Sequence, residues 1–241
     1  MSKYLQYPLS TMAEIALEFT TTSCNRPEIL DLTYSSYVSR LKGIDFQKST
    51  LYINIDPAPD SSNISEMEKV AKKYFGKVVA NYPKEPNFAA AIIWCFSQVK
   101  GEYFFHLEDD WILTQEVNIK ALIKRVGYHN IQCVLNKKVM LKNELGEPCF
   151  IPSLFRTEIV KRYLPLMNSA SNPEYQMKMI FRKNKAGLNT YRSVLWRKSH
   201  EISKDIGRAW LKKNGIVRDY AKTGKSSAKW SPWITWRTKK K

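Results

Sequence analysis

Segments with the pattern of buried β-strands alternate with helical segments over the first 140 residues. Short apolar and β-branched runs occupy residues 16–21, 49–55, 77–81, 103–107 and 132–139. Between them, the spacing of apolar side chains predicts helices over residues 27–41, 64–75, 87–98 and 117–126. Strands that alternate with helices form mostly parallel sheets covered on both faces. We therefore predict an α/β fold with such a sheet.

The periodic pattern weakens after residue 150. We expect a helix after Pro152 within residues 151–163, helices over residues 174–184 and 202–214, and a loop over residues 168–173. Residues 1–150 are accordingly expected to form the chemical core. Residues 151–241 are expected to form a basic, more irregular part of the same domain.

The net charge of +17 is confined to this C-terminal part. Residues 1–150 contain 17 basic and 17 acidic side chains, whereas residues 151–241 contain 22 basic and 5 acidic ones. With 44% hydrophobic residues, the composition excludes a mostly disordered chain. A neutral core joined to a basic part suggests contact with a polyanion, either nucleic acid or an anionic membrane surface.

The sequence contains no apolar run near the roughly 20 residues that a membrane helix needs. The first 20 residues also lack the charged start and apolar stretch of a signal peptide. We therefore expect a cytoplasmic protein, in the host cell if the protein is viral. Four cysteines lie far apart in the sequence and are expected to be reduced: Cys24, Cys95, Cys133 and Cys149.

Three consecutive acids, Glu108, Asp109 and Asp110, directly follow the apolar run at residues 103–107. Open parallel sheets bind ligands at the carboxyl ends of their strands. Adjacent carboxylates repel one another, and Mg²⁺ or Mn²⁺ relieves this repulsion while keeping positions open for phosphates. The triplet predicts a metal-bridged diphosphate, and the alternative is a solvated acidic turn or helix start.

The segment FFHLEDDW at residues 104–111 resembles the DxD-like motif of the GT-A class of nucleotide-sugar-dependent glycosyltransferases. The segment FTTTSCNRP at residues 19–27 is similar to the first strand and nucleotide-binding loop of this class. Asp56 after the second strand, and NFAAA at residues 87–91, follow in the expected order. The resemblance covers about residues 15–125. It implies a GT-A fold, a nucleotide-sugar donor with a uridine diphosphate leaving group, and Mn²⁺ or Mg²⁺ as cofactor.

The resemblance also implies roles for the acids. Asp110 would ligate the metal directly, and Glu108 and Asp109 would touch the ribose, the sugar or metal-bound water. Some members of the class complete the metal shell with a late histidine, and His200 is the candidate here. An ordinary surface histidine is the alternative.

Further positions would line the donor site. Thr21 and Arg26 would line the nucleotide, Asp56 would face the base or ribose, and Arg208 could clamp the diphosphate. Each residue also has a structural alternative. The Thr21 hydroxyl could bond to backbone, Arg26 could be a surface cation and Asp56 could cap a turn. Arg208 could lie on the surface of a helix.

Transfer to a hydroxyl with inversion of configuration needs a base on the far side of the sugar. Glu174 follows the loop at residues 168–173 and is our candidate, because it resembles the later acidic position of many inverting members. The alternatives are a structural glutamate at a helix start, or a retaining enzyme that needs no such base.

The excess positive charge favours duplex DNA as the acceptor, because a neutral sugar acceptor has no need of it. Ordinary bases offer no alcohol, so the expected acceptor is a hydroxymethylated pyrimidine, as in DNA-modifying enzymes of bacteriophages. The residues expected to contact phosphates are Lys183, Lys185, Arg192, Arg197, Lys198, Lys212 and Lys213.

Two other functions stay open at this point. One is a peripheral-membrane glycosyltransferase of surface glycan synthesis, with Trp230, Trp233 and Trp236 at an anionic interface. The other is a non-enzymatic nucleic-acid-binding protein. No obligate protein partner is inferred.

Overall fold

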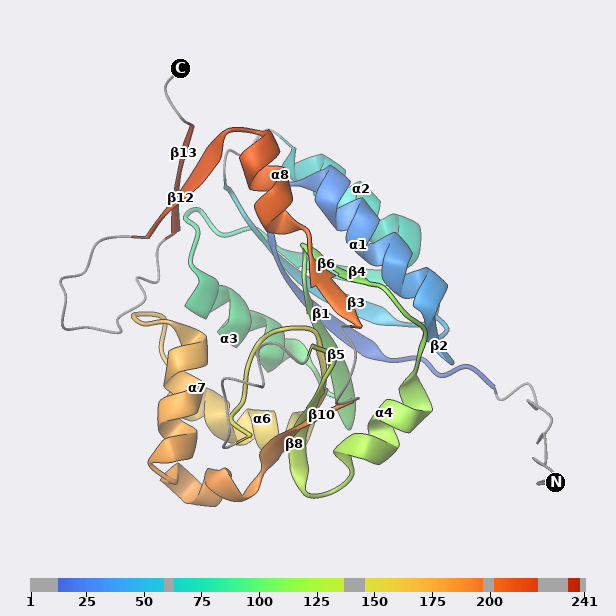
Figure 1. Ribbon diagram of the computed structural model, residues 1–241, viewed down its shortest axis with the longest axis vertical. Coiled ribbons are helices and arrows are strands. Elements are labelled where there is room, and N and C mark those ends of the chain that lie inside the picture. Colours follow the sequence, from blue (N-terminus) through green and yellow to red (C-terminus); the bar gives the residue numbers. More distant parts are fainter. Residues whose placement is uncertain (1–12, 59–62, 137–145, 197–201, 221–233, 239–241) are drawn as a thin grey trace, which may run out of the picture.

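A computed structural model describes residues 13–58, 63–136, 146–196, 202–220 and 234–238. Within them, one seven-stranded sheet has the order β10-β8-β9-β5-β1-β3-β4 (Figure 1). Its strands are β1 (Glu18–Cys24), β3 (Thr50–Asp56), β4 (Lys77–Asn81), β5 (Tyr103–Glu108), β8 (Asn130–Val134), β9 (Ser153–Arg156) and β10 (Arg192–Leu195). β9 runs antiparallel to both of its neighbours, and the other neighbouring strands pair in parallel. The mostly parallel α/β sheet predicted from the sequence is confirmed.

Helices cover both faces of the sheet (Figure 1). They are α1 (Pro27–Arg40), α2 (Ile64–Tyr74), α3 (Phe88–Gln98), α4 (Ile119–Val126), α6 (Thr157–Tyr163) and α7 (Pro173–Arg182). Buried residues of α1, α2 and α4 form one hydrophobic cluster with Phe105 of β5, whereas those of α3, α6 and α7 form a second cluster with Phe104. Successive side chains of a strand point to opposite faces. The two helical layers therefore pack on opposite sides of the sheet.

Short ribbons and 3₁₀ turns complete the described structure. β2 (Leu41–Lys42) pairs with β7 (Val117–Asn118), β6 (Trp111–Leu113) with β11 (Ser203–Asp205), and β12 (Ile216–Tyr220) with β13 (Ile234–Thr238). Two 3₁₀ turns, η1 (Leu164–Leu166) and η2 (Lys185–Thr190), flank α7, and α8 (Gly207–Lys213) follows β11.

Two helix predictions in the C-terminal part are wrong at their starts. Residues 153–156 form the strand β9, because Leu154 packs into the cluster on one face of the sheet and Phe155 into the other. Residues 203–205 form β11, which pairs with β6 before α8 begins. The sheet thus takes strands from both sides of residue 150. The strand expected over residues 132–139 is β8, and residues 137–139 lie outside the described residues.

No helix of the described chain has the length and hydrophobicity required to cross a membrane. The four cysteines are free thiols.

Candidate functional site

The acidic triplet lies at the carboxyl edge of the sheet, where β1, β3 and β5 end together. In the parallel registers, Cys24 lies beside Asp56 and Thr22 lies beside Glu108. Figure 1 shows this edge below α8, between the beginning of α3 and the β6 strand. The three loops that follow these strands can therefore contribute to one site, as the sequence predicted.

Arg26 and Asp109 form a buried bidentate ion pair at the centre of this edge. The Arg26 Nη2 atom lies 2.6 Å from Asp109 Oδ1, and Arg26 Nε lies 3.2 Å from Asp109 Oδ2. The two side chains are only 1% and 5% exposed. Asp109 and its neighbour Asp110 raise the pKa of Arg26 in spite of its burial, which alone would lower it. Arg26 is therefore a fixed cation inside the site rather than a surface charge.

Asp109 is held from several sides. The backbone N–H of Cys24 donates to Asp109 Oδ2 at 3.0 Å, and Ser23 Oγ donates to the same oxygen at 3.3 Å. Thr33 Oγ1 of α1 donates to the Asp109 backbone carbonyl at 2.7 Å. Burial raises the pKa of the Asp109 carboxyl, and Arg26 acts in the opposite direction. Both carboxylate oxygens serve to fix the loop between β1 and α1.

Asp110 is covered by the segment that leads into α8. Its Oδ2 atom accepts from Arg26 Nη2 at 3.1 Å, and its backbone carbonyl accepts from the N–H of Ile206 at 2.8 Å. A Cβ atom added to Gly207 would lie 2.0 Å from Asp110 Oδ2. Only a residue without a side chain can therefore lie against this carboxylate.

The tryptophan of α8 closes the site from outside. The guanidinium carbon of Arg26 lies 5.5 Å from the centre of the Trp210 ring. Trp210 Nε1 donates to Glu28 Oε1 at 2.5 Å. β11 holds this segment in place, since Asp205 pairs with Trp111 immediately after the acids. Arg26 is thus enclosed between two carboxylates and an indole.

Asp56 belongs to a polar chain along the ends of β3 and β4. Asn54 Nδ2 donates to Asp56 Oδ1 at 2.8 Å, and Asn81 Nδ2 donates to Asn54 Oδ1 at 2.6 Å. Burial raises the pKa of Asp56 to about 6, although its hydrogen bonds with Asn54 and the backbone of Asn87 oppose the rise. Asp56 is therefore a partly exposed acid poised to change charge near neutral pH.

Asn87 connects this edge to the loop before α7. Its backbone N–H bonds to Asp56, and its side-chain oxygen caps α3 by accepting from the N–H of Ala90 at 3.0 Å. Asn87 Nδ2 donates to the carbonyl of Ser169 at 3.2 Å. Glu174, the expected base, lies in the first turn of α7, and Lys178 Nζ donates to its Oε1 atom at 2.7 Å.

Two other residues expected at the donor site differ in exposure. Thr21 is fully buried within β1, and its hydroxyl accepts from Tyr34 at 3.1 Å. The side chain of Arg208 is 90% exposed and pairs with Asp205 at 3.3 Å. His200, Arg197 and Lys198 lie outside the described residues.

The remaining expected phosphate-contacting residues divide into two groups. Lys212 and Lys213 are exposed at the end of α8, whose first residue, Gly207, lies against Asp110. Lys183, Lys185 and Arg192 are exposed around η2, at the lower end of α7 in Figure 1. The structure therefore does not bring these five cations into one surface.

Gly207, Trp210, Glu28 and Asn87 join the site without having been assigned to it from the sequence. Asn87 carried a usable signal, because an asparagine directly before an apolar helix is a typical N-cap. Gly207 carried none, since its contact with Asp110 depends on how β11 folds back onto β6.

Comparisons with known proteins agree with this fold. No protein-family model matches the sequence, and no curated protein matches it. Among solved structures, S. aureus TarS 1-349 superposes with a TM-score of 0.57 at 12% identity, over 78% of this chain and 60% of that one. TarS 1-349 in complex with UDP-GlcNAc matches with the same TM-score over 58% of its length. The chain thus spans less than two thirds of these TarS chains.

Two further matches carry a metal with the nucleotide. The mannosyltransferase PcManGT from Pyrobaculum calidifontis, in complex with GDP-Man and Mn²⁺, has a TM-score of 0.55 at 12% identity, over 86% of this chain and 64% of that one. Glucosyl-3-phosphoglycerate synthase from Mycobacterium tuberculosis, in complex with Mg²⁺ and uridine diphosphate, has a TM-score of 0.51 at 12% identity, over 83% and 74%. These similarities establish a GT-A-like α/β fold.

Proposed function

We propose that this chain transfers a sugar from a nucleotide sugar to a hydroxyl acceptor. The observation that supports this most is the meeting of Asp110, Arg26 and Asp56 at the carboxyl edge of β5, β1 and β3. This is the edge at which open parallel sheets bind their ligands. Structures with the same fold were solved with UDP-GlcNAc, with GDP-Man and Mn²⁺, and with uridine diphosphate and Mg²⁺.

The acids are compatible with a divalent cation shared with the donor. Asp110 would hold the metal, with Glu108 beside it at the end of β5. Both oxygens of Asp109 bind Arg26 or Cys24, and Asp110 shares Arg26 through Oδ2. No group of three or more histidine, cysteine or acidic side chains among the described residues could hold a metal by itself. Proteins usually bind Mg²⁺ through one or two carboxylates together with the phosphates of the substrate. A bound metal would stabilise negative charge that develops on the departing diphosphate.

The protein's own residues hold and orient the donor. Arg26 fixes Asp109 and with it the turn that presents Asp110, and Asp56 accepts a hydrogen bond from the nucleoside. The acceptor hydroxyl attacks the anomeric carbon, its bond to oxygen forms as the bond to the diphosphate breaks, and the hydroxyl proton passes to a base. Glu174 is the candidate for this base, and Lys178 Nζ lies 2.7 Å from its Oε1 atom.

Titration of the protein with uridine diphosphate and guanosine diphosphate, each with and without Mn²⁺, tests the donor proposal. We expect Asp110→Asn to abolish the Mn²⁺-dependent gain in affinity and leave the thermal unfolding midpoint within a few degrees. Asp45→Asn removes an equal charge at a partly exposed position outside the site and should change neither. Absence of nucleotide binding by the wild-type chain would refute the proposal.

For the acceptor, we propose a hydroxymethylated pyrimidine in duplex DNA, supported by the exposed Lys212 and Lys213 on the helix that covers the site. Incubation of unmodified and hydroxymethylated duplexes with protein, Mn²⁺ and nucleotide sugars should add the mass of one sugar residue to the hydroxymethylated duplex alone. Donor hydrolysis with no mass gain on any duplex would exclude DNA and keep the glycosyltransferase. Glu174→Gln should slow transfer by about 10²-fold or more if Glu174 is the base.

A further inference from the structure

A cluster of cations lies at the edge of the sheet opposite the acidic site. Arg156 pairs with Tyr103, the first residue of β5, and the acids follow the last residue of this strand. Arg192 begins β10 beside Asn130, the first residue of the parallel strand β8. Both arginines therefore lie at the amino edge. Figure 1 shows the labels of β8 and α7 in the lower part of the view and α8 near its top.

The cluster is organised by contacts between α6, η2 and β10. Arg162 Nη2 donates to the carbonyl of Ala186 at 2.7 Å, and Arg162 Nη1 donates to the Tyr191 hydroxyl at 3.2 Å. The Arg162 guanidinium also lies 5.3 Å from the centre of the Tyr191 ring. We call the set Arg156, Arg162, Lys183, Lys185 and Arg192 the amino-edge surface. These contacts fix the Arg162 guanidinium against the segment that carries Lys185.

The turn in this surface has an unusual backbone. Asn184 and Ala186 have positive φ angles of 48° and 54°, and neither is a glycine. Backbone strain of this kind tends to occur at functional sites. Asn184 lies between Lys183 and Lys185, Ala186 follows Lys185, and both lysines are exposed.

Two acidic side chains near this surface pair with arginines. Glu158 pairs with Arg156 at 2.9 Å, and the buried Glu147 pairs with Arg182. Within the described part of the chain, Lys183, Lys185 and Arg192 form no ion pair. Three of the five cations of this surface therefore lack an ion pair among the described residues, and they give the surface a positive potential.

We propose that the amino-edge surface binds the phosphodiester backbone of a duplex nucleic acid at a distance from the reaction site. Exposed lysine and arginine side chains attract the phosphates of such a backbone electrostatically. A membrane surface fits less well, because interfacial binding also uses several inserted apolar side chains. Tyr128 is the large exposed aromatic here, and the Arg156 guanidinium stacks on its ring at 5.3 Å.

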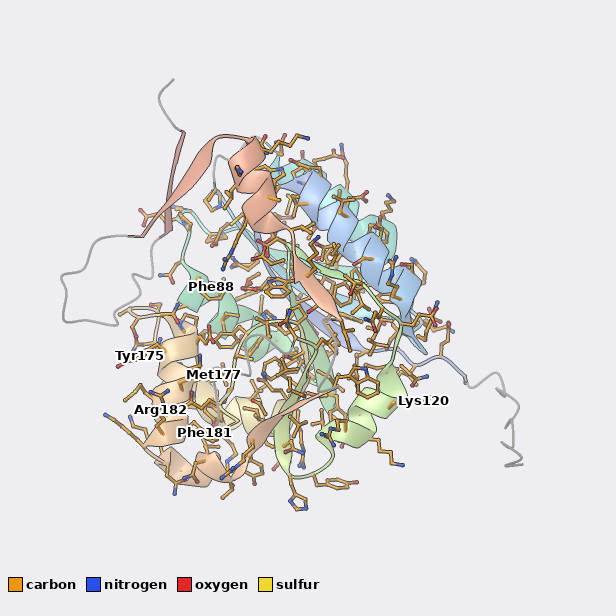
Figure 2. The ribbon with its side chains drawn as sticks, in the orientation of Figure 1. Phe88, Lys120, Tyr175, Met177, Phe181 and Arg182 are labelled. Carbon is orange, nitrogen blue, oxygen red and sulfur yellow. The ribbon has the colours of Figure 1, made fainter. Side chains whose placement is uncertain are left out.

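This proposal deepens the DNA acceptor proposed above and rests on it. The six residues of β5 separate the two edges by about 20 Å. A duplex of about 30 base pairs is about 100 Å long and can contact both. Figure 2 shows α7 between the two regions, with Tyr175 near its upper end and Arg182 near its lower end.

The test measures binding of a fluorescent duplex of about 30 base pairs to the full chain across a salt series, without any donor. The triple variant Lys183→Gln, Lys185→Gln, Arg192→Gln should reduce the slope of log affinity against log salt by about 2.7, which corresponds to three phosphate contacts. The matched control is Lys48→Gln, Lys69→Gln, Lys72→Gln, which removes the same charge from exposed sites near α2. The control should retain the wild-type slope.

An equal loss in both triple variants would overturn the proposal, because it would show a general charge effect. Flotation with vesicles of phosphatidylglycerol and phosphatidylcholine provides the other decisive result. If the amino-edge variant loses vesicle binding but keeps duplex binding, the surface is a membrane contact and the proposal is wrong. Since no donor is present, failure of nucleotide binding by the wild type would refute the proposed transfer and leave this result standing.

Discussion

Arg26 Nη2 and Asp109 Oδ1 lie 2.6 Å apart, and both side chains are almost completely buried. A buried charge without its partner is strongly unfavourable. Replacement of Arg26 by methionine keeps much of its volume and leaves Asp109 unpaired. We expect Arg26→Met to lower the free energy of unfolding by about 3–5 kcal/mol in urea denaturation.

The control for Arg26→Met is Lys69→Met, which removes the exposed ion pair with Glu66. Exposed pairs contribute about 0–1 kcal/mol. If both variants lose similarly little stability, the buried pair does not hold the loop between β1 and α1.

Gly207 lies against Asp110 so closely that an added methyl group would overlap the carboxylate. We expect Gly207→Ala to displace either α8 or Asp110, with a cost of about 1–3 kcal/mol in stability. Affinity for uridine diphosphate with Mn²⁺ should fall about tenfold or more. Gly101→Ala is the control, because its methyl group would meet Glu18 Oε2 at 3.3 Å, far from the acids. Unchanged nucleotide affinity in Gly207→Ala would separate this contact from donor binding.

Trp210 contributes both a hydrogen bond to Glu28 and a ring against Arg26. Trp210→Phe removes the bond and keeps a ring, whereas Trp210→Ala removes both. We expect losses of about 1 and about 2 kcal/mol, in that order. Limited trypsin cleavage after Lys212 and Lys213 should accelerate in the same order, because α8 is released more often. Equal cleavage rates in the wild type and Trp210→Ala would show that the tryptophan does not hold α8.

Much of this fold was predictable because β-strand and helix periodicities are local. The acidic triplet was predictable for the same reason: the apolar run at residues 103–107 must end in the sheet, and the acids can only follow at its carboxyl edge. Residues 153–156 were misread because a segment of four residues with two central apolar side chains fits a helix as well as a strand. Its pairing with β5 and β8 depends on residues about 20 to 50 positions away.

Side-chain roles within the site were less predictable than its position. Arg26 was expected to line the nucleotide, but its orientation depends on Asp109, which is 83 residues away in the sequence. The side chain of Thr21 points into the protein, where its hydroxyl accepts a hydrogen bond from Tyr34 of α1. Such contacts depend on tertiary packing, which no periodic pattern in the sequence encodes.

The pKa of Asp56 is high for an aspartate, and this makes the free energy of unfolding depend on pH. Burial raises its pKa to about 6 in the folded chain, against about 3.9 when unfolded. The folded state therefore holds the proton more tightly between these values, and this group's contribution to stability is lost as pH rises from about 4 to about 6. The full shift corresponds to roughly 2–3 kcal/mol.

We expect Asp56→Asn to remove that decline, so that its stability relative to the wild type increases with pH and levels off above about pH 7. Urea denaturation across this range measures the difference. Asp45→Asn is the control, since the hydrogen bond with Lys48 lowers the pKa of Asp45 and gives no decline in this window. Affinity for uridine diphosphate should rise through about pH 6 in the wild type, because only the carboxylate accepts from the ribose or base. A rise of the same size in Asp56→Asn would assign it to another group and remove Asp56 from the donor site.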